Sequence, residues 1–209
     1  MKIYLVRHAQ SLRNVGQEHD KLSETGIEQA KRLGLFLKNK HIDHIYCSKK
    51  GRTKETLEYI KEYIQAPTTF TKKIQEQDTG VFEEKSDKEF FYHMMSLKLK
   101  GKEYAEYRPD NGENLFDVEK RAQIFLNMIK EKHNHKDHIL IVSHSTFLRL
   151  FILRLLKLHL KEIQYFSIHN ASISEFELDE KFNVKDFEID EFKHLLKYSS
   201  YERETIEKI

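Results

Sequence analysis

The stretch that decides the fold is ILIVSHST, residues 139–146. Its first four residues are apolar and mostly β-branched, which is typical of a short strand buried on both faces. Polar residues follow at once, and residues 147–158 then form an apolar run interrupted by Arg149, Arg154 and Lys157. That run has the length of a buried helix and is too short to cross a bilayer. A buried strand followed by a buried helix is the repeating unit of an α/β protein, with His144 at the carboxyl end of the strand.

The same alternation extends through the chain on both sides of this stretch. The predicted strands are residues 3–6, 44–47, 68–71, 139–142 and 173–178, the last alternating in polarity as an edge strand does. The predicted helices are residues 23–37, 53–64, 90–99, 115–129 and 147–158, the first capped by Ser23 or Thr25. Strands that alternate with helices predict a three-layer α/β/α sandwich with a mostly parallel central sheet.

No boundary divides the chain. It has only 7 Gly and 2 Pro in 209 residues, which leaves no candidate linker, and the sequence contains no repeat or low-complexity tract. We therefore expect a single domain over residues 1–209. Its end, from about residue 190, has the charge and the apolar spacing of an amphipathic helix, and we expect a charged helical tail there.

The composition argues against several classes of function. Lys and Arg number 36 against 34 Asp and Glu, and the two signs are interspersed, so nothing indicates binding to nucleic acid. A single cysteine, Cys47, excludes an internal disulfide and suits a reducing compartment. The strand-like start at residue 3 lacks the features of a signal peptide, and no stretch is fit to span a membrane. We expect a cytoplasmic protein that is a monomer or a homodimer.

Cationic side chains stand at the ends of the predicted strands. In open α/β sheets ligands bind beyond the carboxyl ends of the strands, and there the sequence places Arg7 and His8, then Arg52, then His144. Two histidines and two arginines gathered in one pocket suit a phosphoryl group. The alternatives are a surface pair for Arg7 and His8 and an exposed helix position for Arg52.

Several short stretches together resemble one family. LVRHAQSLRN at residues 5–14, LSETGIEQA at residues 22–30 and VSH at residues 142–144 are similar to blocks of the histidine phosphatase superfamily, which has the phosphoglycerate-mutase-like fold. The remaining blocks of the resemblance contain Ser48, Arg52, Thr56, Glu76, Gly80, Pro109, Gly112, Glu113, Arg121 and Asn170. Together the blocks cover residues 1 to about 178, in the order and spacing of the family.

The resemblance implies a role for five side chains. His8 would attack phosphorus as a neutral imidazole and form a phosphohistidine that water then hydrolyses. Arg7, Arg52 and a protonated His144 would hold the phosphoryl oxygens, so that neither a metal nor another cofactor is required. Glu76 would protonate the leaving oxygen and later accept a proton from water, which calls for a protonated form favoured by partial burial.

Other residues have two interpretations each. Ser11 and Asn14 either bind a phosphate oxygen or brace the loop after the first strand. Glu113 and Arg121 lie near the predicted site, where we favour a structural pair over a role in the chemistry. The predicted substrate-binding set is Arg7, Ser11, Asn14, Arg52, His144 and Ser145.

The sequence also departs from the usual pattern of the family. Ala9 and Ser145 stand where glycine is common, and Lys49 and Lys50 belong to a segment that replaces a proline-containing turn. FEE at residues 82–84 replaces Trp-Glu-Gly. None of these changes removes a proposed catalytic side chain. Lys49, Lys50 and Ser145 face either the leaving group or solvent, so the substrate does not follow from the family.

Two rival interpretations use other residues. His133, His135, Asp137 and His138 lie close together in the sequence and form a candidate metal site, although no cysteine supports it. The aromatic run FFY at residues 90–92 fits core or cleft lining better than a platform for stacking nucleic-acid bases.

The favoured function is hydrolysis of small phosphomonoesters. The alternative within enzymes is phosphoryl transfer of the phosphoglycerate mutase type, which resembles longer chains with a larger insertion than the stretch between Gly80 and Arg108. The alternative from another class is a module that binds a phosphorylated ligand without turnover. All five of the implied catalytic side chains are present, which favours an enzyme.

Overall fold

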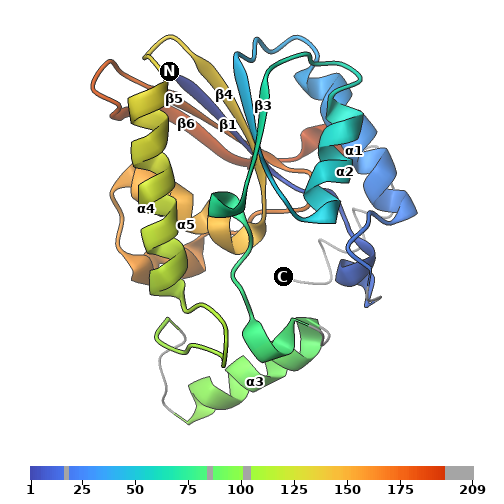
Figure 1. Ribbon diagram of the computed structural model, residues 1–209, viewed down its shortest axis with the longest axis vertical. Coiled ribbons are helices and arrows are strands. Elements are labelled where there is room, and N and C mark those ends of the chain that lie inside the picture. The colour runs from blue at the N-terminus through green and yellow to red at the C-terminus, as the bar shows by residue number, and fades with distance from the viewer. Residues whose placement is uncertain (17–18, 84–86, 101–104, 196–209) are drawn as a thin grey trace.

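A six-stranded sheet forms the centre of the molecule in a computed structural model, which describes residues 1–16, 19–83, 87–100 and 105–195 (Figure 1). The sheet order is β3-β2-β4-β1-β5-β6. The strands are β1 (Lys2–Arg7), β2 (His44–Ser48), β3 (Thr68–Thr71), β4 (His138–Ser143), β5 (Ile173–Leu178) and β6 (Val184–Glu191). The first four strands of this order are parallel, whereas β5 is antiparallel to both of its neighbours. The predicted mostly parallel sheet is confirmed.

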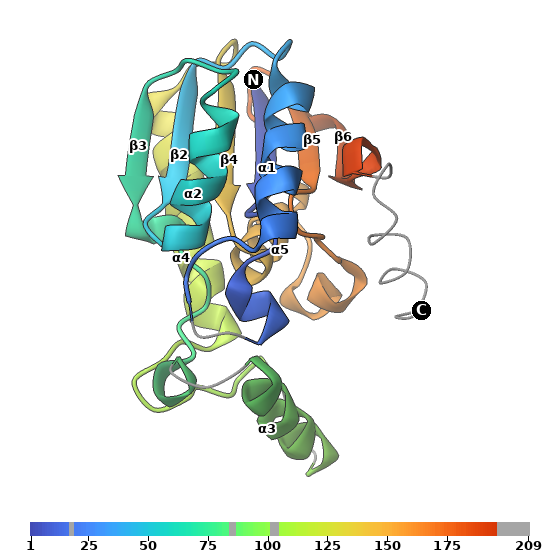
Figure 2. The ribbon, with the colours of Figure 1, turned by 90° about the vertical axis from the view of Figure 1, so that its right-hand side faces the viewer.

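Helices cover both faces of this sheet. α1 (Glu24–Leu37) and α2 (Gly51–Ile60) lie on one face, and α4 (Leu115–Lys132) and α5 (Ser145–Leu156) lie on the other (Figure 2). α3 (Asp87–Leu99) stands apart, beyond the carboxyl ends of the parallel strands. Short 3-10 segments complete the chain: η1 (Leu12–Val15), η2 (Lys72–Ile74), η3 (Gly80–Phe82), η4 (Leu160–Tyr165) and η5 (Lys193–Leu195). The three-layer α/β/α architecture follows the prediction.

The alternation of side chains along each strand divides the core in two. Ile3 and Leu5 of β1 pack in the cluster that contains α4 and α5, whereas Tyr4 and Val6 pack in the cluster that contains α1 and α2. Residues 139–142 of β4 divide in the same way, and all four are fully buried. Central strands covered on both faces need apolar residues at every position, which is why these strands stand out in the sequence.

The edge of the sheet corrects two predictions. β5 was expected to be an edge strand, but β6 pairs with its outer side. β6 has the sequence VKDFEIDE, half of its residues are exposed and none is buried, so an apolar pattern could not reveal it. The predicted helical tail from about residue 190 is wrong at its start, because residues 190–191 end β6 and η5 follows. Residues 196–209 lie outside the described residues.

The helix boundaries differ little from the expected ones. Ser23, not Thr25, caps α1, and its side chain accepts a hydrogen bond from the Gly26 amide at 3.0 Å. α2 begins at Gly51 and ends at Ile60, ahead of the predicted range at both ends. Within the described ranges, no helix is both long enough and apolar enough to cross a membrane.

The first turn of α1 packs directly on the loop that follows β1. A Cβ atom placed on Gly26 would lie 1.9 Å from the carbonyl oxygen of Gln10. The same carbonyl accepts a hydrogen bond from the Ser23 amide at 3.0 Å, and the Gln10 amide donates to Oε1 of Gln29 at 2.9 Å. Glycine is therefore required at position 26, since any side chain there would push α1 away from the loop.

We expect Gly26→Ala to lower the free energy of unfolding by about 2 kcal/mol, because the added methyl group meets backbone atoms that cannot turn aside. Urea unfolding of the purified variant measures the change. Leu35→Ala is the matched control in the same helix, since Leu35 is 57% exposed and its loss should have little effect. Equal stability of the two variants would show that the loop after β1 moves aside at little cost.

Candidate active site

The segments that follow β1, β2, β3 and β4 line a cleft of about 200 Å³. Six of the residues predicted from the sequence line it: Arg7, His8, Ser11, Asn14, Arg52 and Glu76. They come from segments up to 69 residues apart in the sequence, yet the parallel strands bring them to one edge of the sheet. The predicted convergence of these side chains is therefore seen in the structure.

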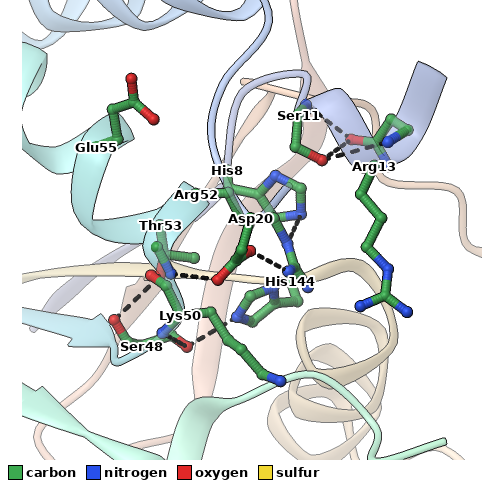
Figure 3. Close-up of polar contacts among 12 residues, drawn as sticks. His8, Ser11, Arg13, Asp20, Ser48, Lys50, Arg52, Thr53, Glu55 and His144 are labelled. Carbon is green, nitrogen blue, oxygen red and sulfur yellow. Dashed lines mark hydrogen bonds and ion pairs between the residues drawn. The ribbon is translucent and has the colours of Figure 1, made fainter. Parts of the chain in front are cut away.

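His8 lies at the base of the cleft, with only 3% of its surface exposed. Its Nδ1 lies 2.8 Å from the carbonyl oxygen of Ala9, which can only accept, so Nδ1 carries the proton. Its Nε2 accepts a hydrogen bond from Nε of Arg52 at 3.1 Å (Figure 3). Burial, helped by the charges of Arg52 and Arg7, holds the pKa of His8 well below its usual value. The imidazole is neutral, and the lone pair of Nε2 is on the side of Arg52.

His144 lies beside His8 and is completely buried. The two rings are 5.2 Å apart in an edge-to-face arrangement, and Nε2 of His144 lies 2.8 Å from the hydroxyl oxygen of Ser48. Burial first, and then the charges of Arg52 and His8, lower the pKa of His144 well below its usual value. The expected protonated His144 is therefore wrong for the protein without ligand, because this environment disfavours the cation.

An aspartate that sequence reasoning missed fixes Arg52. Oδ1 of Asp20 accepts from Nη1 of Arg52 at 2.5 Å, and Oδ2 accepts from the Gly51 amide at the start of α2 (Figure 3). Arg52 is 8% exposed, and among the described residues its Nη2 has no hydrogen-bond partner. Asp20 stands alone in a polar stretch, so no spacing signal marked it.

A loop before β5 supports Arg7 and His8 from the opposite side. Nη1 of Arg7 donates to the carbonyl oxygen of Ile168 at 2.6 Å, and the side-chain amide of Asn170 donates to the carbonyl oxygen of His8 at 3.0 Å. Asp190, at the end of β6, accepts hydrogen bonds from the backbone amide and the ring Nδ1 of His169. The unpredicted edge strand thus anchors the loop that orients the two residues.

Ser11 and Asn14 brace each other at the rim of the cleft. Ser11 caps η1, and Oδ1 of Asn14 accepts from its amide at 3.0 Å and from its hydroxyl at 2.9 Å. These contacts favour the bracing role over direct binding. Ser145 is half-buried, and the neighbouring Thr146 lines the cleft in its place.

The carboxylate of Glu76 lies against the N-terminus of α5. Its Oε1 accepts from the backbone amides of Gln77 at 3.0 Å, Thr146 at 3.1 Å and Phe147 at 3.3 Å. The half-buried Glu76 is therefore held in position at the start of α5 by backbone N–H donors. The protonated form expected from partial burial stays a prediction.

Glu113 and Arg121 hold the segment that carries Glu76. Arg121 donates to both carboxylate oxygens of Glu113, at 3.0 and 2.7 Å, and also to the carbonyl oxygens of Gln75 and Glu76. The Glu113–Arg121 ion pair thus holds the backbone at Glu76 through Arg121 and not the carboxylate of Glu76. The predicted structural pair is confirmed.

The rival sites find no support. His133 bonds to Asp137 at 3.0 Å and to the hydroxyl of Tyr46 at 2.9 Å, and no three His, Cys, Asp or Glu side chains of the described residues are grouped as metal ligands would be. In the aromatic run, Phe90 lines the cleft and Tyr92 is 67% exposed, while the side chain of Phe91 lies outside the described part.

Comparisons with known proteins agree on one family. The model of the histidine phosphatase superfamily (branch 1) matches residues 3–189. Phosphoserine phosphatase 1 from Hydrogenobacter thermophilus (strain DSM 6534 / IAM 12695 / TK-6) is 31% identical, over 88% of this chain and 90% of that protein. Adenosylcobalamin/alpha-ribazole phosphatase from Escherichia coli (strain K12) is 25% identical, over 87% of this chain and 92% of that protein. The crystal structure of the alpha-ribazole phosphatase from Shigella flexneri superposes with a TM-score of 0.79 at 23% identity, covering 91% and 96% of the two chains.

The depressed pKa values of His8 and His144 predict how stability depends on pH. Both values lie below the usual 6.5, so below that pH the unfolded chain binds more protons than the folded protein. The free energy of unfolding is then fully retained above about pH 6.5 and falls below it, by at most about 1.4 kcal/mol per pH unit for each histidine. Urea unfolding between pH 7.5 and 5.5 measures the slope.

The variant that carries both His8→Gln and His144→Gln should show a shallower slope than the wild type. His159→Gln is the matched control, because His159 is exposed and its side chain makes no cap hydrogen bond. If the double variant keeps the slope of the wild type, the two histidines are not the groups that titrate.

Proposed function

The chain belongs to the histidine phosphatase superfamily (branch 1) and is a phosphatase, and we propose that it hydrolyses small phosphomonoesters through a phosphohistidine at Nε2 of His8. One observation carries this proposal: a buried neutral imidazole whose Nε2 lone pair is aligned with Arg52 in a cleft. A neutral nitrogen nucleophile fixed beside a guanidinium is what attack on a phosphoryl group requires.

In the first step Nε2 bonds to phosphorus while the bond from phosphorus to the ester oxygen breaks. The proton on Nδ1 stays on the ring, where the carbonyl oxygen of Ala9 accepts its hydrogen bond and stabilises the positive charge of the phosphorylated imidazole. In the second step water attacks phosphorus and the nitrogen–phosphorus bond breaks. Phosphate leaves, and His8 returns to its neutral form.

Arg7, Arg52 and His144 would bind the three phosphoryl oxygens. Nη2 of Arg52 has no hydrogen-bond partner among the described residues, and the carbonyl oxygen of Ile168 orients Arg7. His144 is neutral before binding, and a phosphate dianion beside it would draw a proton onto its ring. We propose that these groups supply the charge that a metal ion supplies in other phosphatases.

Glu76 would act as the proton donor in the first step and the acceptor in the second. Its backbone contacts keep the carboxylate at the wall of the cleft, where it can reach the leaving oxygen. The same residue then takes a proton from the attacking water.

The reaction would take place in the cytoplasm. The single cysteine suits a reducing compartment, and burial raises the pKa of Cys47 to about 12, which keeps the thiol protonated and unreactive.

Hydrolysis is favoured over transfer of the mutase type, because the relative at 31% identity is a phosphatase and the match covers 90% of its length. Phosphate release from a panel of metabolite phosphates tests hydrolysis, and conversion of 3-phosphoglycerate to 2-phosphoglycerate tests transfer.

We expect His8→Gln to lose at least about 1,000-fold in kcat, because no other described group can accept the phosphoryl group at that place. Samples of the wild type that are denatured in alkaline SDS after mixing with ³²P-labelled substrate should contain a protein-bound phosphate that is stable to base and is lost on later treatment with acid. His159→Gln should keep both the rate and the label. A full rate in the presence of chelator is expected, and a rate abolished by chelator would contradict the metal-free proposal.

We expect the loss of rate in Glu76→Gln to depend on the leaving group of the substrate. Loss of a general acid slows the hydrolysis of an alkyl phosphate by about 100- to 10,000-fold, whereas p-nitrophenolate leaves without protonation and its ester should be affected much less. Steady-state rates with glycerol 3-phosphate and p-nitrophenyl phosphate give the comparison. Equal losses on the two substrates would mean that Glu76 only positions other groups.

A further inference from the structure

Two further cations lie beyond the phosphate clamp and converge on one carboxylate. Arg13 of η1 and Lys50, which precedes α2, reach Oε2 of Glu83 at 3.5 Å and 3.3 Å. Arg13 also donates to the carbonyl oxygen of Glu83 at 2.9 Å. Figure 3 shows both side chains extending away from His8 toward the same side. Arg13 and Glu83 line the cleft itself. We call these three residues the mouth cluster.

The mouth cluster contributes little to stability. The three side chains are 24%, 32% and 32% exposed for Arg13, Lys50 and Glu83, and ion pairs that are partly solvated stabilise a fold only weakly. Arg13 and Lys50 both bind the same carboxylate oxygen of Glu83. An arrangement of this kind exchanges its anion easily, since an incoming carboxylate or phosphate can replace Glu83 at similar cost.

A bound ester would extend toward this cluster. In-line attack by Nε2 of His8 places the leaving oxygen on the far side of phosphorus, away from the base of the cleft. The walls on that side include the rings of Phe82 and Phe90, which meet edge to face at 5.5 Å and can pack against the carbon part of a leaving group. The next groups outward are Glu83 and the two cations that it binds.

We propose that the preferred substrates are phosphomonoesters whose leaving group carries a second anionic group, a carboxylate or a phosphate, which displaces Glu83 from Arg13 and Lys50. This inference rests on the proposed phosphatase activity. It assigns the choice of substrate to residues outside the phosphate clamp, and one of them, Lys50, lies in a segment where the sequence departs from the family pattern.

Two matched pairs of substrates test the proposal. 3-Phosphoglycerate differs from glycerol 3-phosphate by a carboxylate in place of a hydroxymethyl group, and propane-1,3-diol bisphosphate differs from 3-hydroxypropyl phosphate by a second phosphate. The wild type should favour the more anionic member of at least one pair by about 10- to 100-fold in kcat/KM, the effect of one or two charge-assisted hydrogen bonds. The pair that shows the larger preference identifies the anionic group.

The variant with Arg13→Met and Lys50→Met should bring this ratio close to one while changing the rate on p-nitrophenyl phosphate by less than about threefold. The variant with Arg13→Lys and Lys50→Arg keeps the charges and should retain most of the preference. Lys49→Met is the control for charge alone, because Lys49 is exposed. Glu83→Gln removes the competing anion and should lower KM for the anionic substrates.

The possible failures are distinct. If the wild type hydrolyses p-nitrophenyl phosphate and shows no preference within either pair, the inference is wrong and the phosphatase proposal stands. If the methionine variant loses activity equally on all substrates, the cluster is only structural, which also overturns the inference. If the wild type hydrolyses none of the substrates, the proposed function itself fails.

Discussion

The hydrogen bond from Nε of Arg52 to Nε2 of His8 can form only while the imidazole is neutral. Protonation of His8 would break that contact and bury two cations side by side, so the pKa of His8 is held down by the same neighbours that position it. Both partners are fixed without a ligand, Arg52 by Asp20 and His8 by the carbonyl oxygen of Ala9. The imidazole ring is therefore oriented in advance, and because Nε2 has a single lone pair, the hydrogen bond from Arg52 must break as Nε2 bonds to phosphorus.

Asp20, which also binds Arg52, and Glu76 each lie at a helix N-terminus. Asp20 accepts from the first amide of α2, and Glu76 accepts from two amides in the first turn of α5. Backbone donors at a helix N-terminus stabilise these anions, so that they do not need to neutralise Arg7. The order of strand, loop and helix thus serves two purposes, because it brings the cations to the cleft and provides separate partners for the acids.

The sequence predicts the parts of the molecule that depend on local pattern. β1 and β4 were found because central strands are apolar throughout, and His8 and His144 follow from their positions at the ends of these strands. β6 was missed because an exposed edge strand carries charges on both faces, and Asp20 was missed because its role arises only when α2 packs beside it. The low pKa of His144 in the protein without ligand could not be predicted, since burial and neighbouring cations are set by packing and leave no trace in spacing.

The contacts of the cleft become less constrained from its base to its mouth. At the base, buried side chains bind backbone groups or each other, as His8 binds Ala9 and Arg7 binds Ile168, so a substitution there disturbs the fold and the chemistry together. At the mouth, Lys50 and Glu83 are each about one third exposed and bind each other through side-chain atoms alone. Such contacts can change without cost to the sheet. The fold therefore fixes the phosphoryl chemistry, whereas the residues at the mouth are free to set which leaving group it acts upon.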